Sequence, residues 1–203
     1  MIKNLLFDFG DVFINLDKQG AMQNALELFG IKEFSKDMIR INEQYEIGAI
    51  SSEKFLEFYE SKFPKLSRKE IINAWNYILK DFPIHRLAFI QQASKKYRCF
   101  LLSNTNEIHI DWIKNDWGIE LYNDFKSCFE QFYLSHEIGF RKPNKDIYEF
   151  VLHENKLNAS ETLFIDDTKE NTDAAKKIGF NIWNNDPYKQ DVVNLFSIKK
   201  ELF

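Results

Sequence analysis

The stretch that decides the fold is Leu5-Leu6-Phe7-Asp8-Phe9-Gly10-Asp11-Val12, an apolar run that stops abruptly at a carboxylate. Two later stretches have the same form: residues 101–106, Leu-Leu-Ser-Asn-Thr-Asn, and residues 163–167, Leu-Phe-Ile-Asp-Asp. A buried parallel strand is typically such a run, and ligands bind at its carboxyl end in open α/β sheets. We therefore expect the polar groups at these three strand ends to meet at one edge of a parallel sheet.

The rest of the chain alternates between strand-like and helix-like segments, which predicts a Rossmann-like parallel α/β sheet with helices on both faces. Residues 17–80 differ, because they hold helical stripes and no convincing strand. They predict a small four-helix cap inserted after the first strand. The expected domains are an α/β core of residues 1–15 and 84–203, and a helical cap of residues 16–83.

Local signals place the individual elements. Strands are expected near residues 98–103, 130–134, 162–166 and 180–183, and helices near residues 84–96, 107–116, 144–156 and 169–178. Within the insert, Gly30 follows an apolar helical stripe and should end that helix. Ser67, with Glu70 three residues later, predicts a capping box at the start of another helix.

Composition narrows the class of protein. The chain has 203 residues, 44% of them hydrophobic, which suits one large domain or a domain with a modest insert. The formal net charge of −4 argues against a nucleic-acid binder, which would show a basic face. No apolar stretch approaches a membrane span, so we expect no membrane partner, and a monomer or a weak homodimer. The start Met1-Ile2-Lys3-Asn4 has no signal-peptide pattern, and two cysteines form no disulfide framework, so the expected compartment is the cytoplasm.

Asp8 admits a structural and a chemical interpretation. As a lone residue after a strand, it could cap a helix or hold a turn. A carboxylate at a strand end is also a candidate nucleophile that would form an acyl phosphate, and a candidate ligand for Mg²⁺, which prefers oxygen. The polar groups at the other strand ends favour the chemical interpretation.

Asp166 and Asp167 raise a similar choice. Two like charges so close at the end of a buried strand are unfavourable unless a cation or hydrogen-bond donors compensate them, and Mg²⁺ would do so. The alternative is that one acid caps the following helix while the other lies in solvent.

Two further segments offer groups that bind phosphate. Ser103 and Asn104 stand before an expected helix, whose first N–H groups favour phosphate oxygens. Lys142 stands before Pro143 and can neutralise a phosphate as a point charge. Taken alone, Ser and Asn also cap ordinary helices, and an ordinary loop lysine is solvated.

Together these segments resemble the four motifs of the haloacid dehalogenase superfamily of phosphohydrolases, in order and over nearly the whole chain. Residues 46–55 resemble a cap segment of one branch, whose first motif is Asp-x-Gly. That branch includes bacterial α-D-glucose-1-phosphate phosphatases and the phosphatase domain of soluble epoxide hydrolases. The resemblance implies a Mg²⁺-dependent phosphomonoesterase that acts on a small phosphorylated metabolite through a phospho-aspartate.

The resemblance also implies which residues hold the metal. Asp8 would attack phosphorus and bind Mg²⁺ as well. Gly10 would offer its backbone carbonyl to the ion. Asp167 would ligate Mg²⁺ directly, and Asp166 would sit in or beside its coordination sphere.

The remaining motif residues would, by the same resemblance, handle the phosphoryl group. Ser103 would bind phosphate oxygens with help from Asn104. Lys142 would neutralise both the phosphoryl group and the nucleophile. Asn171 falls where the superfamily often places a polar group that supports the metal and the lysine.

Position 10 departs from the common pattern. Most phosphatases of this superfamily have a second Asp two residues after the nucleophile, and general acid–base help of that kind contributes about 10²–10⁴ in rate. Here that position is Gly10, while Asp11 is either a replacement or a residue that holds the local turn. A sugar 1-phosphate is one substrate hypothesis that suits this departure, because its anomeric alkoxide leaves more readily than an ordinary alkoxide.

Two other functions stay open. A haloacid dehalogenase would use the same Asp nucleophile on carbon without a metal, although Asp166 and Asp167 would repel its carboxylate substrate. A non-catalytic phosphometabolite-binding or regulatory protein on this scaffold would account for Gly10. Such a protein would more often have lost one of the other motif residues, and all of them are present.

Overall fold

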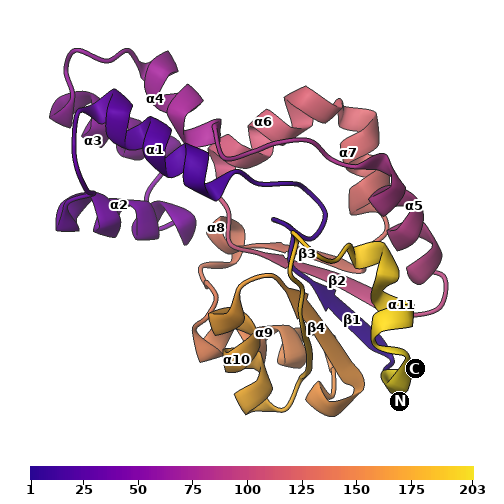
Figure 1. The fold of residues 1–203 in the computed structure, drawn as a ribbon. Helices are drawn as coiled ribbons and strands as arrows, with labels where there is room; N and C mark the ends of the chain where they lie inside the picture. Colours follow the sequence, from indigo (N-terminus) through magenta and orange to yellow (C-terminus); the bar gives the residue numbers. More distant parts are fainter.

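The computed structural model describes residues 1–203 and contains a five-stranded parallel sheet with helices on both faces (Figure 1). The strands are β1 (Asn4–Phe7), β2 (Arg98–Ser103), β3 (Gln131–Leu134), β4 (Thr162–Asp166) and β5 (Asn181–Asn184). Their order in the sheet is β3-β2-β1-β4-β5, which places β1 at the centre. The expected Rossmann-like α/β fold is confirmed.

The helices outside the insert follow the expected alternation, with three additions. They are α5 (Ile84–Ala93), α6 (Glu107–Trp117), α7 (Ile119–Lys126), α8 (Ser135–Ile138), α9 (Lys145–Asn155), α10 (Lys169–Ile178) and α11 (Leu195–Ile198). The sequence did not predict α7, α8 and α11, which are the short helices among these seven. None of the helices combines the length and the apolar character that crossing a bilayer requires.

The two faces of the sheet carry separate hydrophobic clusters, because successive side chains of a strand point to opposite sides. Leu5 and Phe7 belong to a cluster of 25 buried residues that includes side chains from α5, α6 and α7. Leu6 belongs to a cluster of 9 buried residues built with α9 and α10. Because β1 is buried on both faces, it has a continuous apolar run rather than an alternating pattern.

Four helices between β1 and α5 form the separate lobe at the upper left of Figure 1, which we call the helical insert. They are α1 (Lys18–Phe29), α2 (Lys36–Glu46), α3 (Ser52–Lys62) and α4 (Arg68–Asn76). Gly30 ends α1 with a left-handed φ of 64°, and Ser67 and Glu70 form the expected capping box of α4. Both local signals are therefore confirmed.

The helical insert is joined to the sheet by a short paired ribbon. Leu16 on the outgoing segment and Leu79 on the returning segment form an antiparallel bridge. The N–H of Asp17 donates to the carbonyl of Ile78 at 2.9 Å. The ribbon brings both ends of the insert to the same point above the carboxyl end of β1.

The hydrophobic core of the insert includes one buried residue from outside the insert. It contains 9 buried residues, and one of them, Ile108, comes from α6. We propose that residues 16–83 form a cap domain on a core domain of residues 1–15 and 84–203, with Ile108 as a core residue that completes the packing of the cap.

The turn after α2 lies directly against α8. The Ser135 hydroxyl donates to the carbonyl of Glu46 at 2.6 Å. Gly48 lies so close to His136 that an added Cβ would stand 2.0 Å from the His136 carbonyl oxygen. Gly48 also has a φ of 68°, which a residue with a Cβ rarely adopts. Both constraints require glycine here.

We expect Gly48→Ala to lower the free energy of unfolding by roughly 2–4 kcal/mol, because the methyl group would strain φ and also meet a backbone carbonyl. Gly30→Ala is the matched control, since Gly30 has a similar φ and nothing within 4 Å of an added Cβ. That control should lose only about 1 kcal/mol. Urea unfolding measures both, and equal losses would contradict the close approach of the turn to α8.

Candidate active site

Three adjacent strands bring their polar ends to one edge of the sheet. Phe7 is paired with Leu101 of β2 and with Ile165 of β4. Asp8, which follows Phe7, is therefore level with Asp166, and Ser103 lies one residue further along β2. Parallel pairing with this register places the nucleophile candidate between a hydroxyl and a carboxylate.

Lys142 is the buried centre of this arrangement. Its Nζ donates to Asp8 Oδ1 and to Asp166 Oδ2, each at 2.7 Å, and its side chain is only 1% exposed. Burial raises the pKa of Asp8 to about 7; the ammonium of Lys142 opposes this shift, and the carboxylates of Asp166 and Asp167 add to it. Burial also works against the charge on Lys142, but the two carboxylates outweigh it and raise the pKa of the ammonium.

Two amides fix the position of this lysine. Asn104 accepts from the backbone N–H of Lys142 at 2.9 Å and donates to its carbonyl at 2.8 Å. Asn171 donates to both oxygens of Asp166 at 3.1 Å, and the N–H of Thr168 donates to Asp166 Oδ1 at 2.8 Å. Asp166 is fully buried, and its carboxylate is occupied by these donors, so it orients Lys142.

Oxygen ligands for a metal gather beside the lysine. Carboxylate oxygens of Asp8, Asp166 and Asp167 lie within 4.8 Å of one another. Gly10 lines the same pocket, and its carbonyl accepts no hydrogen bond from the protein. Three acids and a carbonyl form a hard donor set that fits Mg²⁺. Since Asp166 is already occupied, the ligands we propose are Asp8, Gly10 and Asp167, with Asp166 beside them.

Groups that can receive an anion lie on the other side of the nucleophile. The Ser103 hydroxyl lines the pocket, and the backbone N–H groups of Gly10 and Asn104 have no acceptor within the protein. Unpaired N–H groups at a strand end are suited to phosphate oxygens. The side chain of Asn104 is committed to the backbone of Lys142, so any contact of Asn104 with phosphate would come from its N–H.

Asp11 is held as a turn residue. It has a left-handed φ of 54°, and its Oδ1 accepts from the N–H of Leu16 at 2.9 Å. Its Oδ2 lies 2.9 Å from Lys18 Nζ, and Asn185 donates to its carbonyl at 3.3 Å. Asp11 does not line the pocket that Asp8 lines. Of the two interpretations that the sequence allowed, the geometry favours the turn.

Lys18 is a site residue that the sequence did not reveal. Its Nζ lies 2.5 Å from Asp167 Oδ2 as well as near Asp11, and it lines the pocket. Partial burial opposes its charge, but hydrogen bonds from Lys18 to Asp167 and Asp11 outweigh this and raise the pKa of the ammonium. The available signal was a lysine in the first turn of a helix, where the helix dipole disfavours a cation unless acids hold it.

Leu16 occupies the space where the usual second Asp would stand. A Cβ added at Gly10 would lie 2.6 Å from Leu16 Cδ1. The absence of a side chain at position 10 is therefore matched by an apolar side chain beside it. No sequence pattern indicated this contact, because Leu16 lies six residues away in a segment with no expected element.

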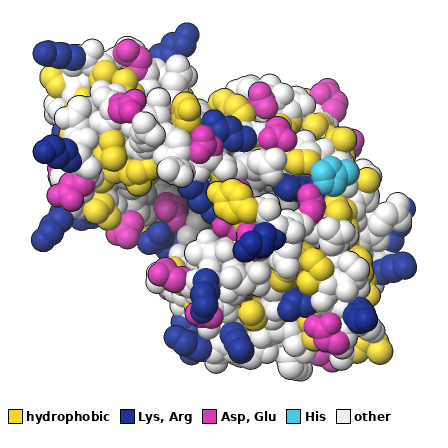
Figure 2. Space-filling model, in the orientation of Figure 1, with side chains coloured by type: hydrophobic (Ala, Val, Ile, Leu, Met, Phe, Trp, Pro, Cys, Tyr) yellow, Lys and Arg dark blue, Asp and Glu magenta, His cyan; other side chains and the backbone are white.

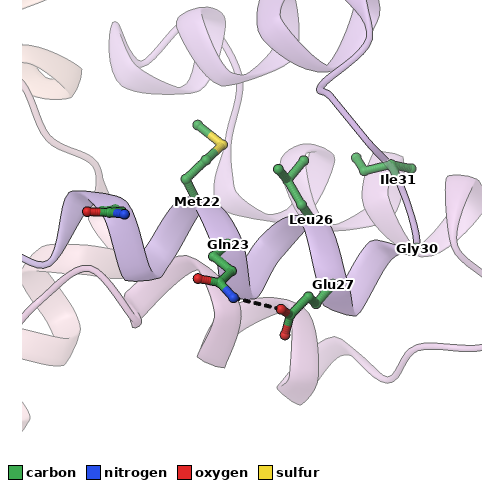
Figure 3. A pocket seen from close by; sticks show the side chains of 7 residues that line it. Met22, Gln23, Leu26, Glu27, Gly30 and Ile31 are labelled. Carbon is green, nitrogen blue, oxygen red and sulfur yellow. Dashed lines mark hydrogen bonds between the residues drawn. The ribbon is translucent and has the colours of Figure 1, made fainter.

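Most of these residues, but not Asp11 or Asp166, line a pocket of about 320 Å³ at the junction of the insert and the sheet. Figure 2 shows the surface hollowed between the two lobes, with acidic and basic side chains along the hollow. A larger hollow of about 610 Å³ lies on the outer side of α1 (Figure 3). Its one charged side chain, Glu27, accepts a hydrogen bond from Gln23 at 2.9 Å. The groups able to do chemistry thus lie in the smaller, polar pocket.

Arg141 connects the pocket to the insert. Its Nε donates to Glu46 at 3.1 Å and its Nη1 to Glu43 at 3.2 Å, both on α2. The carboxylate of Glu46 thus faces this guanidinium. Trp75 packs against the hydrophobic cluster of the insert.

Comparisons with known proteins agree with this geometry. Residues 2–179 match the family described as haloacid dehalogenase-like hydrolase. A curated relative, D-ribitol-5-phosphate phosphatase of Bacteroides thetaiotaomicron, is 28% identical and covers 89% of this chain and 90% of its own length.

Solved structures are similar over the whole chain. A HAD family enzyme of Bacteroides thetaiotaomicron, crystallised with magnesium and inorganic phosphate, is 32% identical with a TM-score of 0.81, over 97% of this chain and 100% of its own. A HAD-like family hydrolase of Porphyromonas gingivalis is 27% identical with a TM-score of 0.84, over 100% of this chain and 98% of its own.

The raised pKa of Asp8 predicts how the free energy of unfolding of the metal-free protein changes with pH. The pKa of an Asp is about 4 in an unfolded chain and about 7 here, so this group destabilises the fold as pH rises through that range. The native chain should therefore lose stability as pH rises from about 5 to 8, and Asp8→Asn should lose less over the same range because it lacks the titrating carboxyl. Urea unfolding in a chelator measures this.

Asp124→Asn is the control for that experiment, because Asp124 is exposed and its side chain makes no hydrogen bond. Its stability should follow the native chain at every pH. An Asp8→Asn protein whose stability falls as steeply as that of the native chain between pH 5 and pH 8 would contradict the account of the buried carboxylate.

Proposed function

The chain belongs to the haloacid dehalogenase-like hydrolases, and we propose that it is a Mg²⁺-dependent phosphomonoesterase for a small phosphorylated carbohydrate. The observation that carries this proposal is the buried contact of Lys142 with Asp8, beside the second acid Asp167. It joins a nucleophile, a fixed cation and a metal-binding acid in one pocket, which are the groups that phosphoryl transfer requires.

Asp8 is the nucleophile of the proposed reaction. One of its oxygens accepts from Lys142, and the other accepts no hydrogen bond from the protein. A carboxylate oxygen of Asp8 forms the bond to phosphorus while the bond between phosphorus and the ester oxygen breaks, which leaves an acyl phosphate. Water then cleaves the acyl phosphate, releasing inorganic phosphate and restoring Asp8.

The other residues stabilise the charge on the phosphoryl oxygens. Lys142 supplies a fixed positive charge, and Asn104 keeps its backbone in place. Ser103 and the free N–H groups of the pocket donate hydrogen bonds. Mg²⁺, held by Asp8, the Gly10 carbonyl and Asp167, supplies further positive charge and favours the ionised form of Asp8.

The substrate class has two candidates. The relative named D-ribitol-5-phosphate phosphatase, which covers nearly the whole chain, supports a phosphate on a primary carbon of an open-chain polyol. Gly10, which supplies no general acid, supports an aldose 1-phosphate, whose leaving group needs less protonation. We propose the alditol phosphate as the leading candidate, because a relative aligned over 89% of the chain bears on this chain's substrate directly.

The other functions are less well supported. A dehalogenase would have to bind a carboxylate substrate next to Asp8, Asp166 and Asp167, which would repel it. A binding protein would not need a lysine buried between two acids, an arrangement in which removing one partner leaves an unpaired buried charge.

Release of inorganic phosphate from ribitol 5-phosphate tests the function. We expect activity with Mg²⁺ and none with a chelator, and we expect Asp8→Asn to lower kcat by at least about 10³-fold, because the nucleophile is lost. Aldose 1-phosphates and 4-nitrophenyl phosphate form the comparison panel. Chloride release from a haloacid without Mg²⁺, or no phosphate release from any of these esters, would overturn the proposal.

Restoring an acid at position 10 requires room for it. Gly10→Asp alone should gain less, because a methyl group of Leu16 must move aside to admit the new side chain. Gly10→Asp combined with Leu16→Ala should raise kcat/KM for alkyl phosphates by roughly tenfold or more over Leu16→Ala alone, since a general acid would then reach the leaving group. A double variant no better than Leu16→Ala would contradict this.

A further inference from the structure

Lys18 reaches the catalytic pocket from the helical insert. It stands in the first turn of α1, directly after the paired ribbon, and its ammonium lies among the groups that surround Asp8. Asp167 Oδ2 lies 2.5 Å and Asp11 Oδ2 lies 2.9 Å from its Nζ. Half of the side chain is exposed, and the pocket that it lines also contains Asp8.

A residue of the turn that follows β1, Asp11, holds Lys18 in position. Asp11 is fixed at both ends, because its Oδ1 accepts from the N–H of Leu16 and its carbonyl accepts from Asn185. Its remaining oxygen is thereby aimed at Lys18. When Asp167 is engaged by another cation, Asp11 still holds the ammonium at the pocket. The flexible four-carbon stem lets the ammonium move towards a bound ester.

The pocket needs a donor for the departing oxygen. Gly10 has no side chain, and Asp11 is occupied by the turn. Lys142 is buried against Asp8 and Asp166, and Arg141 is bound by two glutamates of α2. Among the cations that line the pocket, Lys18 is the one that is both half exposed and next to the metal-binding acid.

We propose that the ammonium of Lys18 donates a hydrogen bond to the ester oxygen that leaves as the alcohol, and so serves as the catalytic group that Gly10 does not supply. This inference rests on the proposed phosphomonoesterase function. As the bond between phosphorus and the ester oxygen breaks, negative charge develops on that oxygen and the ammonium stabilises it. Lys18 keeps its proton. The alcohol takes a proton from solvent, and the water that cleaves the acyl phosphate returns one.

The consequence is a dependence on the leaving group. An alkyl ester, such as an alditol phosphate, develops nearly a full charge on its oxygen and needs the donor. An aryl ester with an acidic phenol, such as 4-nitrophenyl phosphate, develops little charge and does not. A lysine that served only to bind phosphate or to neutralise Asp167 would affect both esters alike.

The test compares kcat/KM for ribitol 5-phosphate and for aryl phosphates of graded phenol pKa, in the full-length protein with Mg²⁺. Lys18→Met should lower kcat/KM for the alditol phosphate by about 10- to 100-fold and that for 4-nitrophenyl phosphate by less than about threefold. Lys18→Arg, which keeps a cation, should restore part of the loss. A smaller loss of the same kind is expected for Asp11→Asn, which keeps an acceptor for the Leu16 N–H.

Lys80→Met is the matched control, because Lys80 lies on the same ribbon, 3.7 Å from Asp17, and does not line the pocket. It should change kcat/KM for either ester by less than about threefold. Circular dichroism melting checks that each variant is folded. A Lys18→Met loss that is equal for alkyl and aryl esters, or no loss at all, would overturn the role of Lys18 while leaving the phosphatase function intact. Absence of Mg²⁺-dependent phosphate release in the unaltered protein would instead overturn the function itself, and this inference with it.

Discussion

The ammonium of Lys142, buried between the carboxylates of Asp8 and Asp166, is the interaction on which the rest of the site depends. A charge taken out of water is strongly unfavourable unless it is paired and hydrogen-bonded. This lysine meets both conditions, with two contacts of 2.7 Å. The supporting amides of Asn104 and Asn171 follow from the same requirement, because a buried pair is stable only when its geometry is held and its other oxygens find donors.

The contacts of Lys142 with Asp8 and Asp166 determine which acid of the pocket has which role. Asp166 accepts from Lys142 and from its neighbouring donors, so Asp167 is the acid of this pair that can bind another partner. It meets a second lysine, Lys18, that comes from the helical insert. The contact of Lys142 with Asp8 and Asp166 is therefore buried, while Lys18 on the outer side is half exposed and belongs to the insert. Such an arrangement suits a reaction whose phosphoryl group is always the same and whose leaving group varies.

Much of the fold could be predicted from the sequence because its strands are buried on both faces. The central strand appears as an unbroken apolar run, and Gly30, Ser67 and Glu70 mark helix ends through local hydrogen bonding and φ. The short helices α7, α8 and α11 could not be recognised, since each has few residues and takes its stability from packing rather than from a periodic pattern. The contact of Glu46 with Arg141 could not be recognised either, because the two residues are 95 positions apart in the chain.

The sequence by itself determined the parallel α/β class, the inserted helices and the acids, hydroxyl and lysine at the strand ends, because these follow from periodicity and from where apolar runs stop. Only the tertiary structure decided that Asp166 serves the lysine while Asp167 faces outward, that Asp11 holds a turn, that Leu16 fills the space beside Gly10 and that Lys18 enters the pocket. Those assignments depend on distances between side chains whose residues are separated by a turn or by the whole insert. Local sequence patterns carry no information about such distances.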